Sequence, residues 1–171
     1  MPDCPGSGMH INFSVHGREP GTDLTNYTIA GILENIASMT VFLNPTDQSY
    51  ARLGLNKAPR YISWSSENRS QLIRVPAAFG EFRRAELRSP DPLTNPYLAY
   101  ALIIRAGLQG IRQRLPLPEP ADINLFTADA AVTSLYRTLP ASLTEAAATA
   151  RASSFIRDSL PEAVIRAYTD R

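Results

Sequence analysis

The sequence predicts an α+β domain, with a curved antiparallel sheet backed by helices and a helical C-terminal end. Segments with strand-like alternation all lie before residue 90. From residue 95 onward, the sequence consists mainly of apolar segments with helical spacing and N-cap signals. Strands gathered early and helices gathered late are typical of α+β folds. The 171 residues are enough for one domain with a single core.

The strands are predicted from alternating side chains. In residues 8–15, His10, Asn12 and Ser14 fall on one face, and the apolar residues between them fall on the other. Three further short strands are predicted at residues 60–64, 71–75 and 84–88. In the last of these, Glu86 shares a face with Arg84 and Arg88. The prolines that follow end that strand, because proline donates no ladder hydrogen bond.

Two long helices are predicted from apolar spacing. The first covers residues 27–40, and Asn44 with Pro45 then opens a long loop. The second begins at Asn95 and Pro96, a good N-cap followed by proline in the first turn, and runs to about residue 113. It is apolar nearly all round, so we expect it to be packed on more than one side.

The C-terminal part is predicted to hold two more helices after a proline-rich linker at residues 115–120. Ser142 and Glu145 form a capping-box pattern before an alanine-rich run. Ser159, Pro161 and Glu162 mark the start of the last helix.

The composition argues against several classes of protein. The net charge of +1 gives no reason to expect binding to nucleic acid or an anionic membrane. A single cysteine, Cys4, rules out an internal disulfide framework and suits a reducing compartment. The N-terminus lacks signal-peptide features, and the longest apolar stretch, residues 97–104, is too short to span a bilayer. We therefore expect a soluble, cytoplasmic domain.

Two residues are candidate metal ligands. His10 shares its strand face with polar residues, and a histidine beside a carboxylate suits Mn²⁺ or Mg²⁺. Glu86 lies between two arginines that would lower its pKa and keep it ionised, as a metal ligand must be. The alternatives are a solvated sheet face for His10 and an ordinary ion-pair ladder for Glu86.

Arginines indicate an anionic ligand. Five of them lie in twenty positions, and arginine suits bidentate binding of carboxylate and phosphate. No glycine-rich phosphate loop accompanies them, so a nucleotide site here must be built from side chains of the sheet. These five are Arg69, Arg74, Arg83, Arg84 and Arg88.

Four ordered motifs across about residues 6–111 resemble those of the glutamine synthetase family. They are Gly6-Ser7-Gly8-Met9-His10, Asn44-Pro45-Thr46 through Ser49-Tyr50-Ala51-Arg52-Leu53, Asn68-Arg69-Ser70 with Ile73-Arg74-Val75-Pro76, and Glu86-Leu87-Arg88-Ser89-Pro90-Asp91-Pro92 with Asn95-Pro96-Tyr97-Leu98. Residues 1–171 resemble the C-terminal portion of the catalytic domain, which has a guanido kinase-like fold. The N-terminal β-grasp domain and the first half of the catalytic domain would then be absent.

The resemblance implies a ligase that uses ATP and Mg²⁺ or Mn²⁺ to join glutamate to ammonia or an amine through γ-glutamyl phosphate. It also implies roles for individual residues. The implied metal ligands are His10 and Glu86, the nucleotide-binding residues are Asn12, Ser14, Arg69 and Arg74, the substrate-binding residues are Gly6, Arg52, Arg69 and Arg88, and the catalytic positions are Arg69 and Lys57. The parent of such a chain would be a large homo-oligomer.

Departures from the family pattern leave alternatives open. Pro5 stands where relatives commonly have asparagine, and Lys57 stands where a flap glutamate typically draws in ammonium. Either Lys57 changes the amine acceptor, or neighbouring flap positions slide and compensate. Other metal-ligand glutamates of the family come from earlier strands, so we expect the isolated chain to be inactive. The rivals are a degenerate, non-catalytic half-protein that acts as an assembly or binding module, and a guanidino kinase-like phosphotransferase with Cys4 as its nucleophile candidate.

Overall fold

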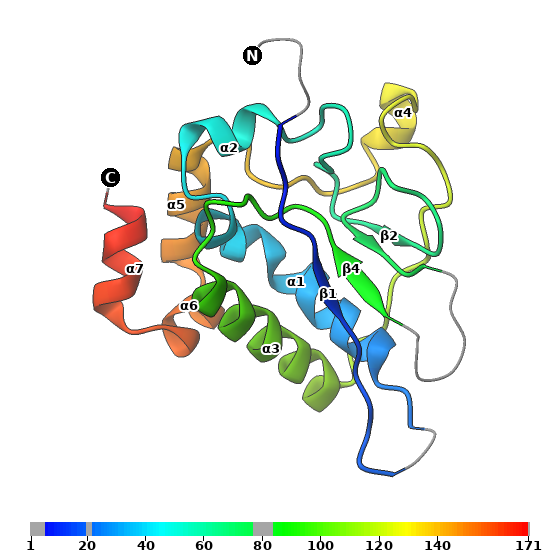
Figure 1. The fold of residues 1–171 in the computed structure, drawn as a ribbon, viewed down its shortest axis with the longest axis horizontal. Helices are drawn as coiled ribbons and strands as arrows, with labels where there is room; N and C mark the ends of the chain where they lie inside the picture. Colours follow the sequence, from blue (N-terminus) through cyan, green and yellow to red (C-terminus); the bar gives the residue numbers. More distant parts are fainter. Residues whose placement is uncertain (1–5, 20–21, 77–83, 171) are drawn as a thin grey trace.

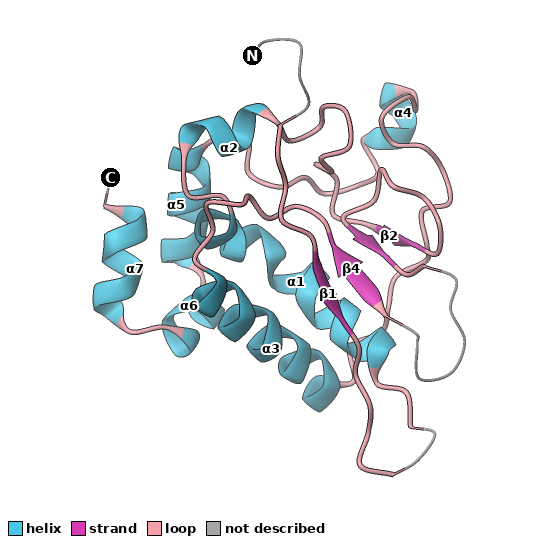
Figure 2. Ribbon diagram, viewed as in Figure 1, coloured by secondary structure: helices cyan, strands magenta, loops and turns pink. Residues whose placement is uncertain are grey.

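A four-stranded sheet lies beside a group of helices in the computed structural model, which describes residues 6–19, 22–76 and 84–170 (Figures 1 and 2). The predicted α+β class is confirmed. The strands are β1 (Ile11–Phe13), β2 (Trp64–Ser65), β3 (Ile73–Arg74) and β4 (Ala85–Leu87). Their order is β1-β4-β3-β2, so the first and last strands along the sequence pair with each other, while β1 and β2 lie at opposite edges.

The sheet is mixed rather than wholly antiparallel. β4 pairs antiparallel with both β1 and β3, as the sequence predicts, whereas β2 and β3 run parallel. Antiparallel pairing places Asn12 opposite Glu86, and Glu86 opposite Arg74. Because side chains directly opposite each other share a face, a polar row crosses three strands. The other face carries Ile11, Leu87 and Ile73, which are buried in the core.

The strands are shorter than the sequence predicts. The alternation predicted for residues 8–15 persists in the burial pattern, but only Ile11–Phe13 pairs with β4. Of the strand predicted at residues 60–64, only Trp64 belongs to β2. Residues 60–62 instead bond to a distant segment, where Ile62 N–H donates to Arg137 O at 2.8 Å. Alternation alone does not reveal a partner so far away in sequence.

Two long helices form the centre of the helical layer. α1 (Thr25–Leu43) and α3 (Pro96–Gln113) contain the two helices predicted from apolar spacing. Asn95 caps α3, its side-chain oxygen accepting from Tyr97 N–H at 3.0 Å. The two helices touch at glycines: a Cβ added to Gly110 would lie 2.0 Å from Tyr27 O, and one added to Gly31 would lie 2.1 Å from Ala106 O. Only glycine permits so close an approach of two backbones.

The remaining helices are short. A loop was expected after Pro45, but α2 (Asp47–Ala51) forms there because Thr46 and Ser49 make a capping box. α5 (Leu143–Ala152) begins after Ser142, as predicted. α4 (Ala130–Thr133) and α6 (Ser154–Ser159) are not predicted by the sequence patterns, and Ser159 ends α6 rather than starting α7 (Glu162–Thr169). Figure 1 shows α5, α6 and α7 grouped at one side of α1.

In the described part of the chain, no helix combines the length and apolar character needed to cross a membrane.

Candidate functional site

The polar row of the sheet brings together a histidine, a carboxylate and two arginines. His10 Nδ1 lies 2.7 Å from Glu86 Oε1. Glu86 Oε2 lies 3.3 Å from Arg74 Nε and 3.2 Å from Arg88 Nη1. Three different elements therefore converge on one carboxylate: the segment before β1, strand β3, and the end of β4. The register of the sheet accounts for this, because it places these positions on one face.

Glu86 stays ionised in this setting. Its burial acts to raise the pKa of the carboxyl, but attraction from Arg88, Arg74 and His10 outweighs burial and holds the pKa below its usual value. Arg88 is almost fully buried, with 3% of its side chain exposed. Burial lowers the pKa of the Arg88 guanidinium, Glu86 acts to raise it, and the neighbouring charges of Arg74 and Arg69 lower it further.

Several polar atoms of this row have no hydrogen-bond partner within the described chain. They include Glu86 Oε2, Arg74 Nε and Arg88 Nε, and all are buried. The ion-pair distances of 3.2 and 3.3 Å around Glu86 Oε2 are long for charge-assisted bonds, which are typically about 2.8 Å. Buried polar atoms that make no hydrogen bond are costly in a folded protein, so a bound ligand or ion that contacts them would stabilise this row.

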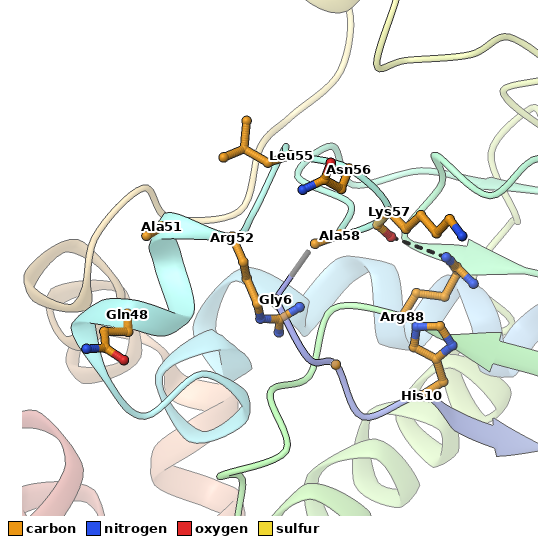
Figure 3. Close-up of a pocket in the computed structure, with 11 residues that line it drawn as sticks. Gly6, His10, Gln48, Ala51, Arg52, Leu55, Asn56, Lys57, Ala58 and Arg88 are labelled. Atoms are coloured by element: carbon orange, nitrogen blue, oxygen red, sulfur yellow. Dashed lines mark hydrogen bonds between the residues drawn. The ribbon is translucent and has the colours of Figure 1, made fainter. Parts of the chain in front are cut away.

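A cavity of about 470 Å³ adjoins the polar row. Figure 3 shows the side chains of His10 and Arg88 next to each other at one end, with Arg52 beside Gly6. No carboxylate is among the lining residues, while Arg52, Lys57 and Arg88 supply three cations, so the cavity suits an anionic ligand. The lining residues are Gly6, Gly8, His10, Gln48, Ala51, Arg52, Leu55, Asn56, Lys57, Ala58 and Arg88.

A tight loop places Lys57 at the cavity. Gly54 and Asn56 both have positive φ, of 87° and 54°, a conformation that glycine and asparagine adopt most readily. The loop is closed by Gly54 N–H donating to Ala58 O at 2.9 Å. Arg88 Nη2 then donates to the Lys57 carbonyl oxygen at 3.2 Å, the bond drawn in Figure 3. The loop is thus fastened to the polar row through a buried arginine.

Arg52 is held in place from one side. Its Nη2 donates to Asn44 Oδ1 at 2.8 Å and to the carbonyl oxygen of Ser89, and its Nε lies 3.5 Å from Asp91 Oδ2. Burial lowers the pKa of this guanidinium, although Asp91 acts to raise it. A Cβ added to Gly8 would lie 3.6 Å from Arg52 Nη1, which places this third nitrogen against the N-terminal segment that lines the cavity. The guanidinium is therefore both fixed and accessible to a ligand.

A divalent cation fits part of this arrangement. His10 and Glu86 supply one imidazole nitrogen and one carboxylate, which suit Mg²⁺ or Mn²⁺, and Glu86 Oε2 has an unsatisfied lone pair. Within residues 6–19, 22–76 and 84–170, however, no group of three or more histidine, cysteine, aspartate or glutamate side chains could hold a metal. The described residues therefore offer a pair of ligands rather than a complete metal site.

The predicted site residues fall into two groups. Gly6, His10, Arg52, Lys57 and Arg88 line the cavity, and Glu86 and Arg74 join them through the polar row. Arg69, Asn12 and Ser14 are exposed and do not line the cavity.

The predicted neighbour of Glu86 was wrong, and three residues singled out in the sequence lie outside the described ranges. Arg84, expected beside Glu86, is exposed, and Arg74 from the neighbouring strand takes that place instead. Sequence spacing alone could not show this, because the pairing of β3 with β4 decides it. Cys4, Pro5 and Arg83 lie outside the described residues.

Sequence reasoning missed the residues that support Arg52. Asn44 and Asp91 belong to the quoted motifs, where each stands beside a proline, but the sequence pattern predicts no role for either; in the structure both contact Arg52. Asn56 and Gln48, which line the cavity, carried no signal in the sequence pattern.

The comparisons with known proteins agree on one family. The model of the glutamine synthetase catalytic domain matches residues 1–171. Glutamine synthetase from Methanosarcina mazei is 42% identical over 177 aligned residues, which cover 95% of this chain and 40% of that protein. Glutamine synthetase from Staphylococcus aureus is 46% identical over 133 residues, covering 71% of this chain and 30% of the relative.

A solved structure has the same fold. The structure described as a GmaS/ADP complex superposes with a TM-score of 0.80 at 27% identity, over 96% of this chain and 41% of that one. The chain thus spans about two fifths of the length of the M. mazei enzyme and of this structural neighbour.

Proposed function

The chain belongs to the glutamine synthetase family, and from this premise we propose that it is the C-terminal portion of an ATP-dependent ligase. The whole protein would join glutamate to ammonia or an amine. The observation that carries the proposal is the convergence of His10, Glu86 and Arg88 beside a cavity without carboxylates. A carboxylate substrate and nucleotide phosphates are the anions that such a site would bind.

The proposed reaction has two steps. The γ-carboxylate of glutamate attacks the terminal phosphorus of ATP, which gives γ-glutamyl phosphate and ADP. The amine nitrogen then attacks the acyl carbon and forms the amide bond, and phosphate leaves while the nitrogen loses a proton. Negative charge grows on the transferred phosphoryl group in the first step, so fixed cations around it stabilise the transition state.

The proposed roles rest on the family motifs, and the position of the two cavity arginines supports theirs. Arg52 and Arg88 hold the glutamate carboxylates, because both guanidiniums line the cavity and are fixed by protein partners. The Gly6 carbonyl oxygen accepts from the substrate amine. Arg74 and Arg69 interact with nucleotide phosphates, together with Asn12 and Ser14 on the exposed face near β1. The presence of ADP in the GmaS structure supports a nucleotide as ligand.

The metal would be held by His10 and Glu86. Mg²⁺ or Mn²⁺ held by this pair would supply positive charge that stabilises the transferred phosphoryl group. The Arg88 and Arg74 guanidiniums keep Glu86 ionised for this role. Since the described residues provide only this pair, any further protein ligands would come from outside the described residues.

Lys57 supports a proposal about the acceptor. Lys57 lines the cavity, and its carbonyl oxygen accepts from Arg88, so its ammonium group would lie within reach of the substrate carboxylates. A cation there repels ammonium and favours an acceptor amine that carries an acid group of its own. The shifted-flap alternative predicts instead that Lys57 has no influence on the choice of acceptor.

Turnover by a hybrid enzyme tests the proposed function. In the hybrid, this chain replaces the matched segment of the M. mazei glutamine synthetase. We expect the hybrid to form a γ-glutamyl amide from ATP, glutamate and an amine. A folded hybrid that forms none would support the alternative of a non-catalytic half-protein, which the incomplete ligand set favours.

The isolated chain provides the second arm of the test. With only two metal ligands among its described residues, we expect it to release no phosphate from ATP in the presence of glutamate and ammonia. Phosphate release that depends on all three substrates and is abolished by Arg69→Ala would contradict this expectation.

A further inference from the structure

Gln71, just before β3, is an amide side chain with no exposed surface. Its Nε2 donates to the carbonyl oxygens of Ala121 and Ile123, at 2.7 and 2.8 Å. Its Oε1 accepts from the hydroxyl group of Ser63. Carbonyl oxygens can only accept, so the amide nitrogen must face the two carbonyls, and both of its protons are used. Gln71 therefore ties the start of β3 to a segment about 50 residues further along the chain.

The two carbonyls belong to an irregular segment, residues 118–125, which passes beside β2 between α3 and α4 (Figure 1). Ala121 is only 2% exposed, and its N–H donates to Trp64 O at 2.8 Å. The Trp64 indole Nε1 donates to Pro118 O at 2.7 Å. Irregular backbone that turns inward depends on such partners, because no helix or sheet ladder satisfies its polar groups. Gln71 satisfies two of its carbonyls.

The same segment holds the loop that carries Arg69. We call residues 66–70, between β2 and β3, the Arg69 loop. Ser70 is 2% exposed, and its Oγ accepts from Leu125 N–H at 3.0 Å and donates to Asn68 Oδ1 at 2.9 Å. Asn68 Oδ1 also accepts from Ser70 N–H at 2.9 Å, which closes a tight turn around Arg69. Asn68 N–H donates to Ser65 Oγ at 3.0 Å, which ties the loop to β2.

Arg69 itself is exposed, and no hydrogen bond or ion pair within the described ranges holds its guanidinium. Its charge nevertheless reaches the polar row: burial lowers the pKa of Arg88, and the nearby charge of Arg69 lowers it further. A long side chain without partners of its own is directed only as well as its backbone is fixed. The backbone of Arg69 is fixed by its neighbours in the loop.

We propose that Gln71 is a positioning residue for Arg69. It holds the 118–125 segment in place, and the segment in turn holds the Arg69 loop through Ser70. The consequence for turnover rests on the proposed function, in which Arg69 interacts with nucleotide phosphates. The positioning itself does not, and it is measurable in the chain alone.

Backbone dynamics of the isolated chain test the positioning. Nitrogen-15 relaxation should give the Arg69 amide an order parameter of about 0.85, typical of rigid backbone. Gln71→Met keeps the length of the side chain but removes both donated bonds, and it should lower that value below about 0.6. Asn35→Leu is the matched control, because Asn35 is 8% exposed and also donates two hydrogen bonds, at 2.9 and 3.3 Å, but lies on α1. It should leave Arg69 rigid.

A milder variant keeps the test decisive where Gln71→Met does not fold. Ser63→Ala removes the hydroxyl group that orients the Gln71 amide and leaves both donated bonds possible. It should lower the order parameter of Arg69 by a smaller amount.

A double-mutant cycle in the M. mazei hybrid measures the consequence for turnover. Gln71→Met should lower kcat/KM for ATP about tenfold while Arg69 is present. In the Arg69→Ala hybrid it should lower kcat/KM by less than about twofold, because Gln71 acts through that side chain. Asn35→Leu should change kcat/KM by less than about twofold in both backgrounds.

Two results would overturn the proposal. The first is an unchanged Arg69 order parameter in Gln71→Met, or in Ser63→Ala where only that variant folds. The second is an equal loss of kcat/KM from Gln71→Met with and without Arg69, because Gln71 would then only stabilise the fold. A hybrid with unsubstituted residues that forms no amide contradicts the proposed function instead, and the order parameters then decide the positioning.

Discussion

Glu86 is the carboxylate on which the polar row depends, because three positively charged or protonatable side chains contact it. Arg88 contributes most to the attraction, and its own side chain is 3% exposed. Removing one member of a buried ion pair leaves the other charge without compensation. Glu86 is therefore expected to matter both for the stability of the fold and for the proposed metal binding.

Replacing the carboxylate tests this dependence. We expect Glu86→Gln to lower the free energy of unfolding at pH 7 by about 3 kcal/mol, as for other broken buried pairs. Urea denaturation measures the difference. Glu34→Gln is the control, because Glu34 is 59% exposed and its pair with Arg137 contributes little. Equal losses for the two variants would contradict the account.

The difference in unfolding free energy between the wild type and Glu86→Gln should also depend on pH. The folded-state pKa of Glu86 is below its unfolded value, which is about 4.3. Ionised Glu86 therefore stabilises the fold fully above pH ~4.3, and this contribution is lost as the pH falls through the folded pKa. The gap between wild type and Glu86→Gln should be constant near neutrality and shrink in acid. A gap that widens as the pH falls would show that the carboxylate is not held by cations.

Manganese binding tests the ligand pair. Electron paramagnetic resonance titration of the M. mazei hybrid should show Mn²⁺ affinity reduced about tenfold or more by His10→Ala. The control is His16→Ala, since His16 is the only other histidine in the chain and is exposed. Similar affinities for the two variants would contradict a role for His10 as ligand.

Lys57 tests the choice of acceptor. In the hybrid, Lys57→Glu should raise kcat/KM for ammonia about tenfold, because it replaces a charge that repels ammonium with one that attracts it. Lys57→Ala should give an intermediate value. An unchanged ratio of ammonia to acidic amine use across the three proteins would favour the shifted-flap alternative.

At the scale of elements, the contact between α1 and α3 decides how the helical layer assembles. Gly110 and Gly31 allow the two backbones to touch, while Ile104 and Leu108 of α3 stay exposed. The α1–α3 packing also supports the sheet, because Leu87 and Ile73 share a core with both helices. A change at the glycines should therefore reach the sheet and its polar row.

Alanine in place of glycine where α1 and α3 cross should destabilise the fold. Gly110→Ala should cost about 2 kcal/mol or more of unfolding free energy, because its methyl group would overlap Tyr27 O. Gly107→Ala is the comparison: its nearest contact, at 2.8 Å, is a side-chain methyl of Thr28, and alanine raises helix propensity. Thermal denaturation should rank Gly110→Ala well below Gly107→Ala. The reverse order would contradict a backbone-limited crossing.

Sequence patterns predicted the helices that local signals determine, but they did not predict which distant segments pair. α3 was predictable because Asn95 and Pro96 mark its start and its apolar spacing continues to residue 113. The replacement of Arg84 by Arg74 beside Glu86 was not predictable, because it depends on which strand pairs with β4. The same holds for the parallel β2–β3 pair and for the bond between Ile62 and Arg137.

At the scale of the whole molecule, the fold gathers a candidate site on one face of the sheet. The polar row and the cavity supply cations and two candidate metal ligands. Family motifs made part of the candidate site predictable, since five of the eleven residues that line the cavity are predicted site residues. The contact of Arg52 with Asp91 was not predictable, because it joins segments that lie far apart in sequence.

The most direct test measures γ-glutamyl amide formation by the M. mazei hybrid carrying Arg69→Ala or Arg84→Ala. Both arginines are exposed, so neither change should disturb the fold. Arg69 lies close enough to affect Arg88, and we expect its loss to lower kcat/KM about 100-fold or more, as for other removed transition-state contacts. Arg84→Ala should retain nearly full activity. Equal activities of the two variants would contradict the claim that this chain carries the anion-binding half of the ligase site.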